Sequence, residues 1–507
     1  MRPKQEGWIQ TRIIRNALSN YLTFFWIMGI SFLTTPFIVR SLGEVHYGIW
    51  VLALTCFGSL TYLELGIGLA LTRTVVQDVS KGDLHRLSRK INSVVSMYLV
   101  IASVGAITVS ALLPIFLNRW FRIGPEVVPL AMDVFYLSAF LFILEFPLRM
   151  YLGVLWGFHR FELANQINIV GYTLSQLLIV LFLYFHFGLR TTVLMSGGMA
   201  VLQNGAMFCC VRRLLPGHRF KIVFDLKDMG GLVRKGIHVF VGTLGSQLGM
   251  QTNRLLLGFF QGVGSLTFYE LATKIGNGMF LFLIRASMPL YPAAAQFETQ
   301  GELGKVKSLF LKATKFVTAA SLLLSFLLYI SAPFLIRIWM GERFDHVAVT
   351  LRILLFGYLG LSIVTIPDTL MYGIGRAEVV STEIVLRLAA QLLLGFFLVP
   401  REGVDGAALV FALSILCVGI PFLVLKAKAL GVGIGGLFLE ILFPPLILGA
   451  LASFFFIFVK QASPFLAFSG SLALLVFGLF GFYVGVSDLR LYFTAFKRSF
   501  GPGAPHV

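Results

Sequence analysis

The sequence has few charged residues, few cysteines and no long hydrophilic segment. Only 13% of its 507 residues are Asp, Glu, Lys or Arg, against about 25% in typical soluble domains. The four cysteines fall within apolar runs and lack the spacing of metal ligands, so we expect no metal site. No predicted loop could hold a separate catalytic domain, which needs at least about 50 residues. The composition therefore excludes an ordinary soluble enzyme.

Apolar residues make up 57% of the chain and occur in runs long enough to cross a membrane. A helix needs about 20 apolar residues to span roughly 30 Å of hydrocarbon. Fourteen segments meet this criterion: 13–38, 47–71, 91–117, 128–157, 164–187, 191–211, 236–260, 264–291, 316–338, 348–374, 380–399, 404–425, 437–459 and 465–486. The sequence predicts an all-α polytopic membrane protein with about 14 transmembrane helices.

The first half of the sequence recurs in the second half. The matching positions are Gly43 with Gly262 and Trp120 with Trp339 at a shift of 219, Gly157 with Gly373 and Arg160 with Arg376 at a shift of 216, and Gly188 with Gly403 at a shift of 215. Each copy holds six predicted helices, an even number, so both copies enter the membrane from the same side. The pattern predicts two parallel six-helix repeats, an arrangement found in secondary transporters.

Positive charge follows the predicted membrane topology. Lys and Arg concentrate in alternate loops, which by the positive-inside rule places both termini in the cytoplasm. The net charge of +18 therefore reflects the orientation of the chain in the membrane, and we expect no nucleic-acid partner. The predicted divisions are an N-terminal lobe (1–211), a basic cytoplasmic linker (212–235), a C-terminal lobe (236–425), two additional transmembrane helices (437–486) and a cytoplasmic tail (487–507).

Several charged residues lie inside predicted helices, where insertion into the bilayer is unfavourable and a functional role is the default hypothesis. In three pairs an acid precedes a base by four residues, so both lie on one helix face. The pairs are Glu145 with Arg149, Glu270 with Lys274, and Glu383 with Arg387. Two interpretations stay open for each: mutual neutralisation, or a polar patch that faces a cavity.

Arg254 and Arg285 have no acid four residues before them. Gln247, Gln251 and Arg254 recur at helical spacing and predict a polar stripe, which must face another helix or a cavity. The repeat pairs these three with Met28, Phe32 and Thr35, so the stripe belongs to the second copy alone.

Two single acids complete the set. Glu64 lies near the end of the second predicted helix, and Asp368 follows Pro367, which could open a local water pocket. Either acid could titrate or form a structural hydrogen bond. The sequence contains no catalytic constellation and no phosphate-binding glycine loop, so we expect no enzymatic activity and no cofactor.

The stretch that begins at Thr35 resembles the opening of polysaccharide-biosynthesis membrane proteins. Its matching elements are Leu42-Gly43, Tyr47-Gly48 and Leu65-Gly66-Ile67-Gly68. These proteins are bacterial oligosaccharide flippases of the multidrug, oligosaccharidyl-lipid and polysaccharide (MOP) exporter superfamily. Members often carry Asp where this chain has Glu64.

The resemblance implies a two-lobed, V-shaped transporter that works by alternating access in the bacterial cytoplasmic membrane. Its substrate would be an undecaprenyl-diphosphate-linked oligosaccharide, with membrane lipid and the polysaccharide polymerase machinery as further partners. On this hypothesis Arg254, Arg285 and Lys274 contact the diphosphate. Further cavity candidates are Arg149, Arg387, Gln247 and Gln251, and the candidates for ion coupling are Glu64, Asp368, Glu145, Glu270 and Glu383.

Three alternatives stay open. A peptidoglycan-precursor flippase would have the same architecture and a different sugar head group. A cation-coupled multidrug exporter should line its cavity with acids, which Arg254 and Arg285 disfavour. A membrane-embedded glycosyltransferase or ligase should show a large external loop and a pair of catalytic acids.

Overall fold

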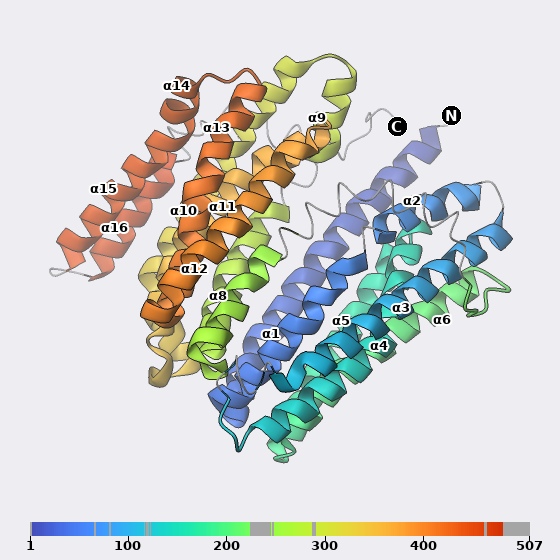
Figure 1. Cartoon of the computed structure of the whole chain (residues 1–507). Coiled ribbons are helices and arrows are strands. Elements are labelled where there is room, and N and C mark those ends of the chain that lie inside the picture. The colour runs from blue at the N-terminus through green and yellow to red at the C-terminus, as the bar shows by residue number, and fades with distance from the viewer. Residues whose placement is uncertain are drawn as a thin grey trace. The chain divides into compact units, whose positions relative to one another are not determined.

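The computed structural model describes residues 3–64, 67–80, 83–115, 117, 121, 123–223, 245, 248–285, 290–460 and 464–479. Within these ranges the chain forms helices and no strand, as the sequence predicts (Figure 1). A helix satisfies its backbone N–H and C=O groups internally, which a lipid-exposed segment requires. Internal contacts divide the chain into an N-terminal unit, Thr11–Thr267, and a C-terminal unit, Phe268–Val507 with Met1–Gln10. The lobe and linker boundaries drawn from the repeat stay a prediction.

The N-terminal unit is organised around α4 (Val128–Gly157), which packs against α2, α3 and α6. The other helices are α1 (Pro3–Leu60), α2 (Ile67–Ser80), α3 (Leu84–Ile115), α5 (Phe161–Tyr184), α6 (Gly188–Leu214) and a helix over residues 248–261. Phe146 of α4 stacks on Tyr98 of α3, with ring centroids 4.9 Å apart, and on Phe142 at 5.1 Å. These rings join α3 to α4 in the core of the unit.

Two long helices are each divided by a glycine. Gly43 in α1 has φ 77°, and Gly403 in α12 (Ala377–Ser414) has φ 57°. Positive φ is a backbone conformation that glycine adopts without steric penalty, so each glycine allows a kink between two apolar segments. The segment predicted at 47–71 is shorter than expected, because α1 ends at Leu60 and a 3₁₀ turn, Thr61–Glu64, precedes α2.

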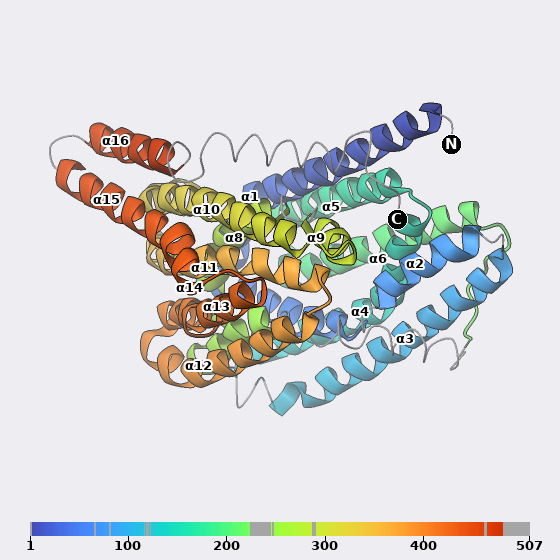
Figure 2. The ribbon, with the colours of Figure 1, turned by 90° about the horizontal axis from the view of Figure 1, so that it is seen from above.

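The C-terminal unit is organised around α11 (Val347–Gly373), which packs against α9, α10, α12 and α13. The other helices are α8 (Val263–Arg285), α9 (Leu290–Thr299), α10 (Leu303–Met340), α13 (Ile420–Ala429), α14 (Ile434–Leu437), α15 (Phe443–Lys460) and α16 (Pro464–Val476). In the most apolar 18-residue stretch of α11, 72% is buried in the protein, against 44% or less in the corresponding stretch of every other candidate span. Figure 2 shows α15 and α16 side by side.

The turn after α4 and the turn after α11 have the same backbone geometry. Arg160 before α5 has φ −98° and ψ 50°, and Arg376 before α12 has φ −96° and ψ 49°. The residues before them, His159 and Gly375, have φ 56° and 73°. In both turns the arginine N–H donates to a carbonyl five residues earlier, at 2.9 Å.

A close helix contact also recurs in the two units. A Cβ on Gly157 of α4 would lie 2.6 Å from Val75 Cβ of α2, and a Cβ on Gly373 of α11 would lie 2.7 Å from Ala294 Cβ of α9. The two glycines are 216 residues apart, and Val75 and Ala294 are 219 apart. These are the shifts of the sequence repeat, so the same contact occurs at positions that the repeat pairs.

The segment that follows α6 is fixed to α3 by polar side chains. Asn92 Nδ2 donates to the Arg219 carbonyl at 2.9 Å, and the Val223 N–H donates to Ser96 Oγ at 3.0 Å. His218 is 2% exposed, and its Nδ1 shares a hydrogen bond of 2.8 Å with the Ser88 hydroxyl. The part of the predicted linker from residue 224 to 235 lies outside the described residues.

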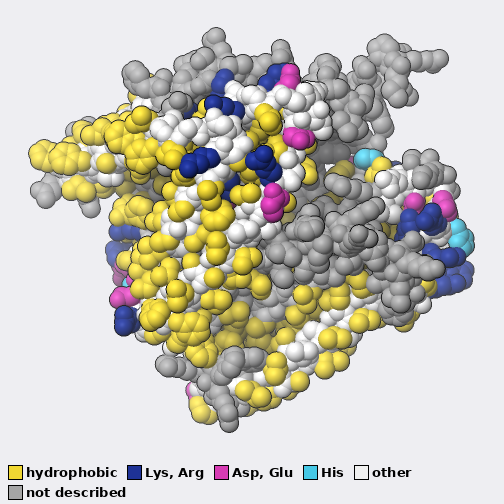
Figure 3. All heavy atoms as spheres, turned by 45° about the horizontal axis from the view of Figure 1, so that its top comes forward, with side chains coloured by type: hydrophobic (Ala, Val, Ile, Leu, Met, Phe, Trp, Pro, Cys, Tyr) yellow, Lys and Arg dark blue, Asp and Glu magenta, His cyan; other side chains and the backbone are white. Residues whose placement is uncertain are grey.

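Eight described helices are long and apolar enough to cross a membrane, and Phe443–Val459 and Ala467–Leu479 are shorter apolar helices. Two of the eight, Tyr21–Glu64 and Ala377–Ala429, are 44 and 53 residues long and contain the glycine bends. On the face shown in Figure 3, hydrophobic side chains cover continuous areas and the basic side chains form small groups. The chain is therefore a membrane protein with multiple apolar helices, and the count of fourteen spans stays a prediction.

Candidate functional site

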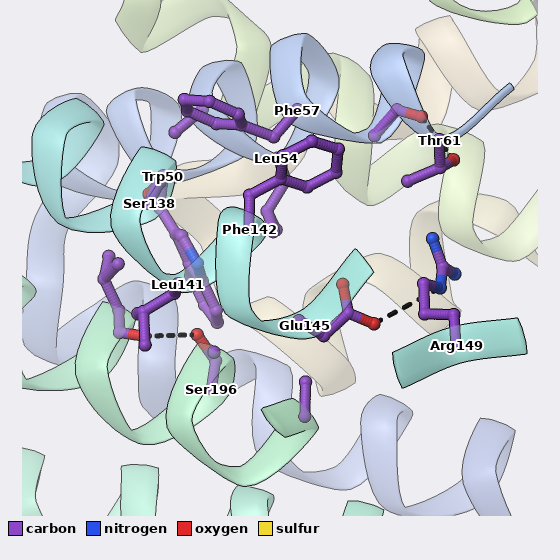
Figure 4. A pocket seen from close by; sticks show the side chains of 15 residues that line it. Trp50, Leu54, Phe57, Thr61, Ser138, Leu141, Phe142, Glu145, Arg149 and Ser196 are labelled. Atoms are coloured by element: carbon purple, nitrogen blue, oxygen red, sulfur yellow. Dashed lines mark hydrogen bonds and ion pairs between the residues drawn. The ribbon is translucent and has the colours of Figure 1, made fainter. Parts of the chain in front are cut away.

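A cavity of about 240 Å³ lies within the N-terminal unit, between α1, α4 and α6 (Figure 4). Trp50 and Phe57 of α1 and Phe142 of α4 give it aromatic walls. Gly197 of α6 also lines it, and a Cβ there would lie 2.6 Å from the Leu141 side chain. The glycine therefore lets α6 approach α4 closely enough to close one side of the cavity.

An ion pair supplies the charge of this cavity. Glu145 Oε1 lies 3.2 Å from Arg149 Nε, one helical turn along α4, and the two side chains are joined by a dashed line in Figure 4. Asn204 of α6 donates to the same Glu145 oxygen at 3.1 Å. The Glu145 side chain is 18% exposed and the Arg149 side chain 45% exposed. The carboxylate is thus held in place while much of the guanidinium stays accessible to a ligand.

Glu64 is the second acid near this arginine. It ends the 3₁₀ turn Thr61–Glu64 and lies close enough to Arg149 for the two charges to attract each other. Thr61, from the same turn, lines the cavity. Arg149 can therefore bind an anion while two acids, on different elements, limit its movement.

A second charge cluster is buried in the C-terminal unit. The Lys426 ammonium of α13 donates to Asp368 of α11 and to Glu383 of α12. Arg387 Nη1 lies 3.7 Å from the other Glu383 oxygen. The side chains of Lys426 and Glu383 are fully buried, and those of Asp368 and Arg387 are 14% and 12% exposed. Two carboxylates and two cations give a cluster with no net charge.

The spacing of four residues predicts the pair of Glu383 with Arg387 but does not include Lys426. The twelfth predicted segment ends at residue 425, directly before this lysine, whereas a π turn at Ile415–Gly419 carries the helix on to Ala429. The Asp368 carboxylate is bound by Lys426, which is one of the two possibilities that the sequence leaves open for this acid. A lysine directly after an apolar run, together with acids in neighbouring helices, was the available signal.

Two of the three residues in the polar stripe of the seventh predicted helix, Gln251 and Arg254, lie in the described part of the chain. Arg254 Nη1 donates to Gln251 Oε1 at 2.8 Å, one turn earlier in the helix over residues 248–261. Gln247 lies outside the described residues. By its contacts this helix belongs to the N-terminal unit.

Three predicted site residues belong to α8: Glu270, Lys274 and Arg285. Glu270 acts electrostatically on Lys274, one turn later. Arg285 is the last described residue of α8, and residues 286–289 lie outside the described part of the chain.

The family of polysaccharide biosynthesis proteins matches residues 13–298, which is more than half of the chain. The chain belongs to this family. The putative O-antigen transporter of Escherichia coli (strain K12) is 24% identical over 343 residues, covering 66% of this chain and 76% of the transporter. The resemblance stated from the sequence is therefore confirmed.

Several solved structures share the fold, among them a lipid flippase and a multidrug transporter. The lipid II flippase MurJ, in an inward closed conformation, has a TM-score of 0.70 at 12% identity, covering 96% of this chain and 99% of the flippase chain. An inward-facing multidrug resistance MATE family transporter of the MOP superfamily has a TM-score of 0.62 at 13% identity, covering 82% and 98%. The fold of this chain is thus that of the MOP superfamily.

Proposed function

We propose that this protein flips an undecaprenyl-diphosphate-linked oligosaccharide across the bacterial cytoplasmic membrane by alternating access. The family supports a role in polysaccharide biosynthesis, and the related transporter of Escherichia coli supports O-antigen as the kind of cargo. The observation that carries the proposal is the half-exposed Arg149 guanidinium in an aromatic cavity. The absence of any large external loop in the sequence disfavours a glycosyltransferase or ligase.

The chemistry of the cavity suits such a substrate. A diphosphate is strongly anionic, and a guanidinium binds phosphate oxygens through two parallel N–H donors. The faces of Trp50, Phe57 and Phe142 offer apolar surface to an isoprenoid chain or to sugar C–H groups. Glu145 holds the arginine in position, so that its N–H groups need not be ordered again when substrate binds.

We further propose that Arg254, Lys274 and Arg285 contact the diphosphate at other stages of transport, and that Gln251 positions Arg254. Two of the five acids suggested for ion coupling, Asp368 and Glu383, bind Lys426. We propose the other three, Glu64, Glu145 and Glu270, as the coupling acids. The polysaccharide polymerase machinery is the proposed protein partner.

The proposed topology has two parallel six-helix repeats and both termini in the cytoplasm. The recurring turns at Arg160 and Arg376 and the recurring contacts of Gly157 and Gly373 support the repeats. Basic residues at the start of α3 and the end of α6 support the orientation, since the His218 and Asn92 hydrogen bonds hold those ends together.

The test compares three variants in a host that lacks its own copy of the gene. Arg149→Ala should lower export about tenfold to a hundredfold, because a hydrogen bond to a charged group is worth about 1.5–3 kcal/mol. Arg149→Lys should retain part of the activity. Arg190→Ala, which removes an exposed arginine paired with Asp133 outside the cavity, is the control and should export normally.

The measured quantities are the lipid-linked repeat units on the inner leaflet and the polysaccharide at the surface. Deletion should cause undecaprenyl-linked units to accumulate inside. Accumulation of peptidoglycan precursor would support the precursor flippase, and altered drug efflux alone would support the exporter. Normal export by Arg149→Ala at normal protein level would contradict the role of the cavity.

A further inference from the structure

The buried cluster of the C-terminal unit has a geometry that bears on ion coupling. Asp368 and Glu383 come from different helices and both accept a hydrogen bond from the one Lys426 ammonium. Lys426 and Glu383 are fully buried among apolar side chains of the unit's core, which includes Ile384 and Leu423. Among the described residues, nothing donates a hydrogen bond to Glu383 Oε1, although Arg387 lies 3.7 Å away.

The charge balance depends on Lys426. With it, two carboxylates are matched by one ammonium and one guanidinium, and the cluster is neutral. Without it, Asp368, Glu383 and Arg387 would leave one negative charge in a buried site. Carboxylate oxygens are the ligands that hard cations prefer, so one monovalent metal cation would restore neutrality.

We propose that the Lys426 ammonium is a built-in counter-cation, which occupies the position where Asp368 and Glu383 would otherwise bind a free monovalent cation such as Na⁺. The tethered ammonium has the same charge as the free ion and is held at the site by the backbone of α13. The two acids therefore do not bind a coupling ion while Lys426 is in place. This inference revises the assignment of Asp368 and Glu383 as coupling residues and is independent of which substrate the protein moves.

The exposed neighbour Lys428 provides a matched control. It lies two residues further along α13, where its side chain points out of the core. Lys428→Met removes the same charge from the same helix without opening the buried site. Lys426→Met keeps most of the side-chain volume and removes the ammonium.

The experiment uses the full-length chain in detergent and measures thermal unfolding in NaCl and in choline chloride at equal ionic strength. The wild type and Lys428→Met should unfold at the same temperature in both salts. Lys426→Met should unfold at a temperature roughly 2–4 °C higher in NaCl, as expected for a ligand that binds only the folded state. Radioactive ²²Na⁺ should bind to this variant and not to the wild type.

Adding Glu383→Gln to Lys426→Met should abolish the effect of sodium, because it removes the excess negative charge. A folded Lys426→Met variant that responds equally to both salts would overturn the proposal. So would stabilisation of the wild type by sodium that is lost in Asp368→Asn. If Lys426→Met does not fold in either salt, the wild type still tests the proposal, because an unfolding temperature that sodium raises would overturn it.

Discussion

A single methyl group at Gly157 should test the close contact that recurs in the two units. In Gly157→Ala the new Cβ would lie 2.6 Å from Val75 Cβ and 3.1 Å from the Thr72 carbonyl oxygen. Ordinary contacts of a Cβ are 3.4–4 Å, so α2 and α4 must move apart by several tenths of an ångström. Overpacking of this kind costs about 1–3 kcal/mol.

The control is Gly198→Ala in α6, where a Cβ would meet nothing within 4 Å. Alanine favours a helix interior over glycine by about 0.5–1 kcal/mol, so this variant should be slightly more stable than the wild type. The difference between the two variants therefore isolates the steric overlap. Gly373→Ala should behave like Gly157→Ala, since its Cβ would lie 2.7 Å from Ala294 Cβ.

The assay is unfolding by sodium dodecyl sulfate in mixed micelles, followed by far-ultraviolet circular dichroism. The expected order of stability is Gly198→Ala, wild type, then the two tight positions. If Gly157→Ala were as stable as Gly198→Ala, the packing of α2 on α4 would not be the tight contact that the geometry indicates. If only one of the two tight positions were sensitive, the contacts would not be equivalent.

Three further predictions concern single side chains. Arg254→Ala should abolish export at unchanged protein level, because its guanidinium is proposed to contact the diphosphate, and normal export would refute that role. Burial, reinforced by the charge of Arg212, lowers the pKa of His218 below its ordinary value of about 6.5. The folded state thus favours neutral His218, so stability should be complete above that pH and fall as the pH is lowered below it. His218→Gln should reduce this loss in the same detergent titration, and an identical pH profile would refute the linkage. Arg190→Ala should change the unfolding free energy by less than about 1 kcal/mol, because its pair with Asp133 is exposed, and a larger loss would contradict that expectation.

The sequence predicted the helical class from the length of its apolar runs, the family from short glycine motifs, and two ion pairs from local periodicity. A spacing of four residues fixes two side chains on one helix face, so the Glu145–Arg149 and Glu383–Arg387 pairs could be identified without a structure. Contacts between helices carry no such spacing. Lys426 lies 43 residues from Glu383 and could not be assigned to it from local pattern.

The boundaries of apolar runs were the other source of error. A run ends at the first charged residue, but a helix ends where its backbone hydrogen bonds end. Lys426 was therefore left outside a helix that continues to Ala429. A charged residue can remain in an apolar core when acids from other helices neutralise it.

The repeat explains why charge in the two units has different roles. At the shifts of 216 and 215 that apply to these segments, Glu145 corresponds to Leu361, and Glu383 corresponds to Asn168. Neither charge cluster is therefore shared by the two copies, although their glycine contacts and turns are. The cluster around Arg149 leaves its cation 45% exposed beside a cavity, whereas the cluster around Lys426 has its cation fully buried. A cation that is to bind an anionic substrate must be accessible to it, so substrate binding is better assigned to the first cluster, and the second is better suited to hold three helices together.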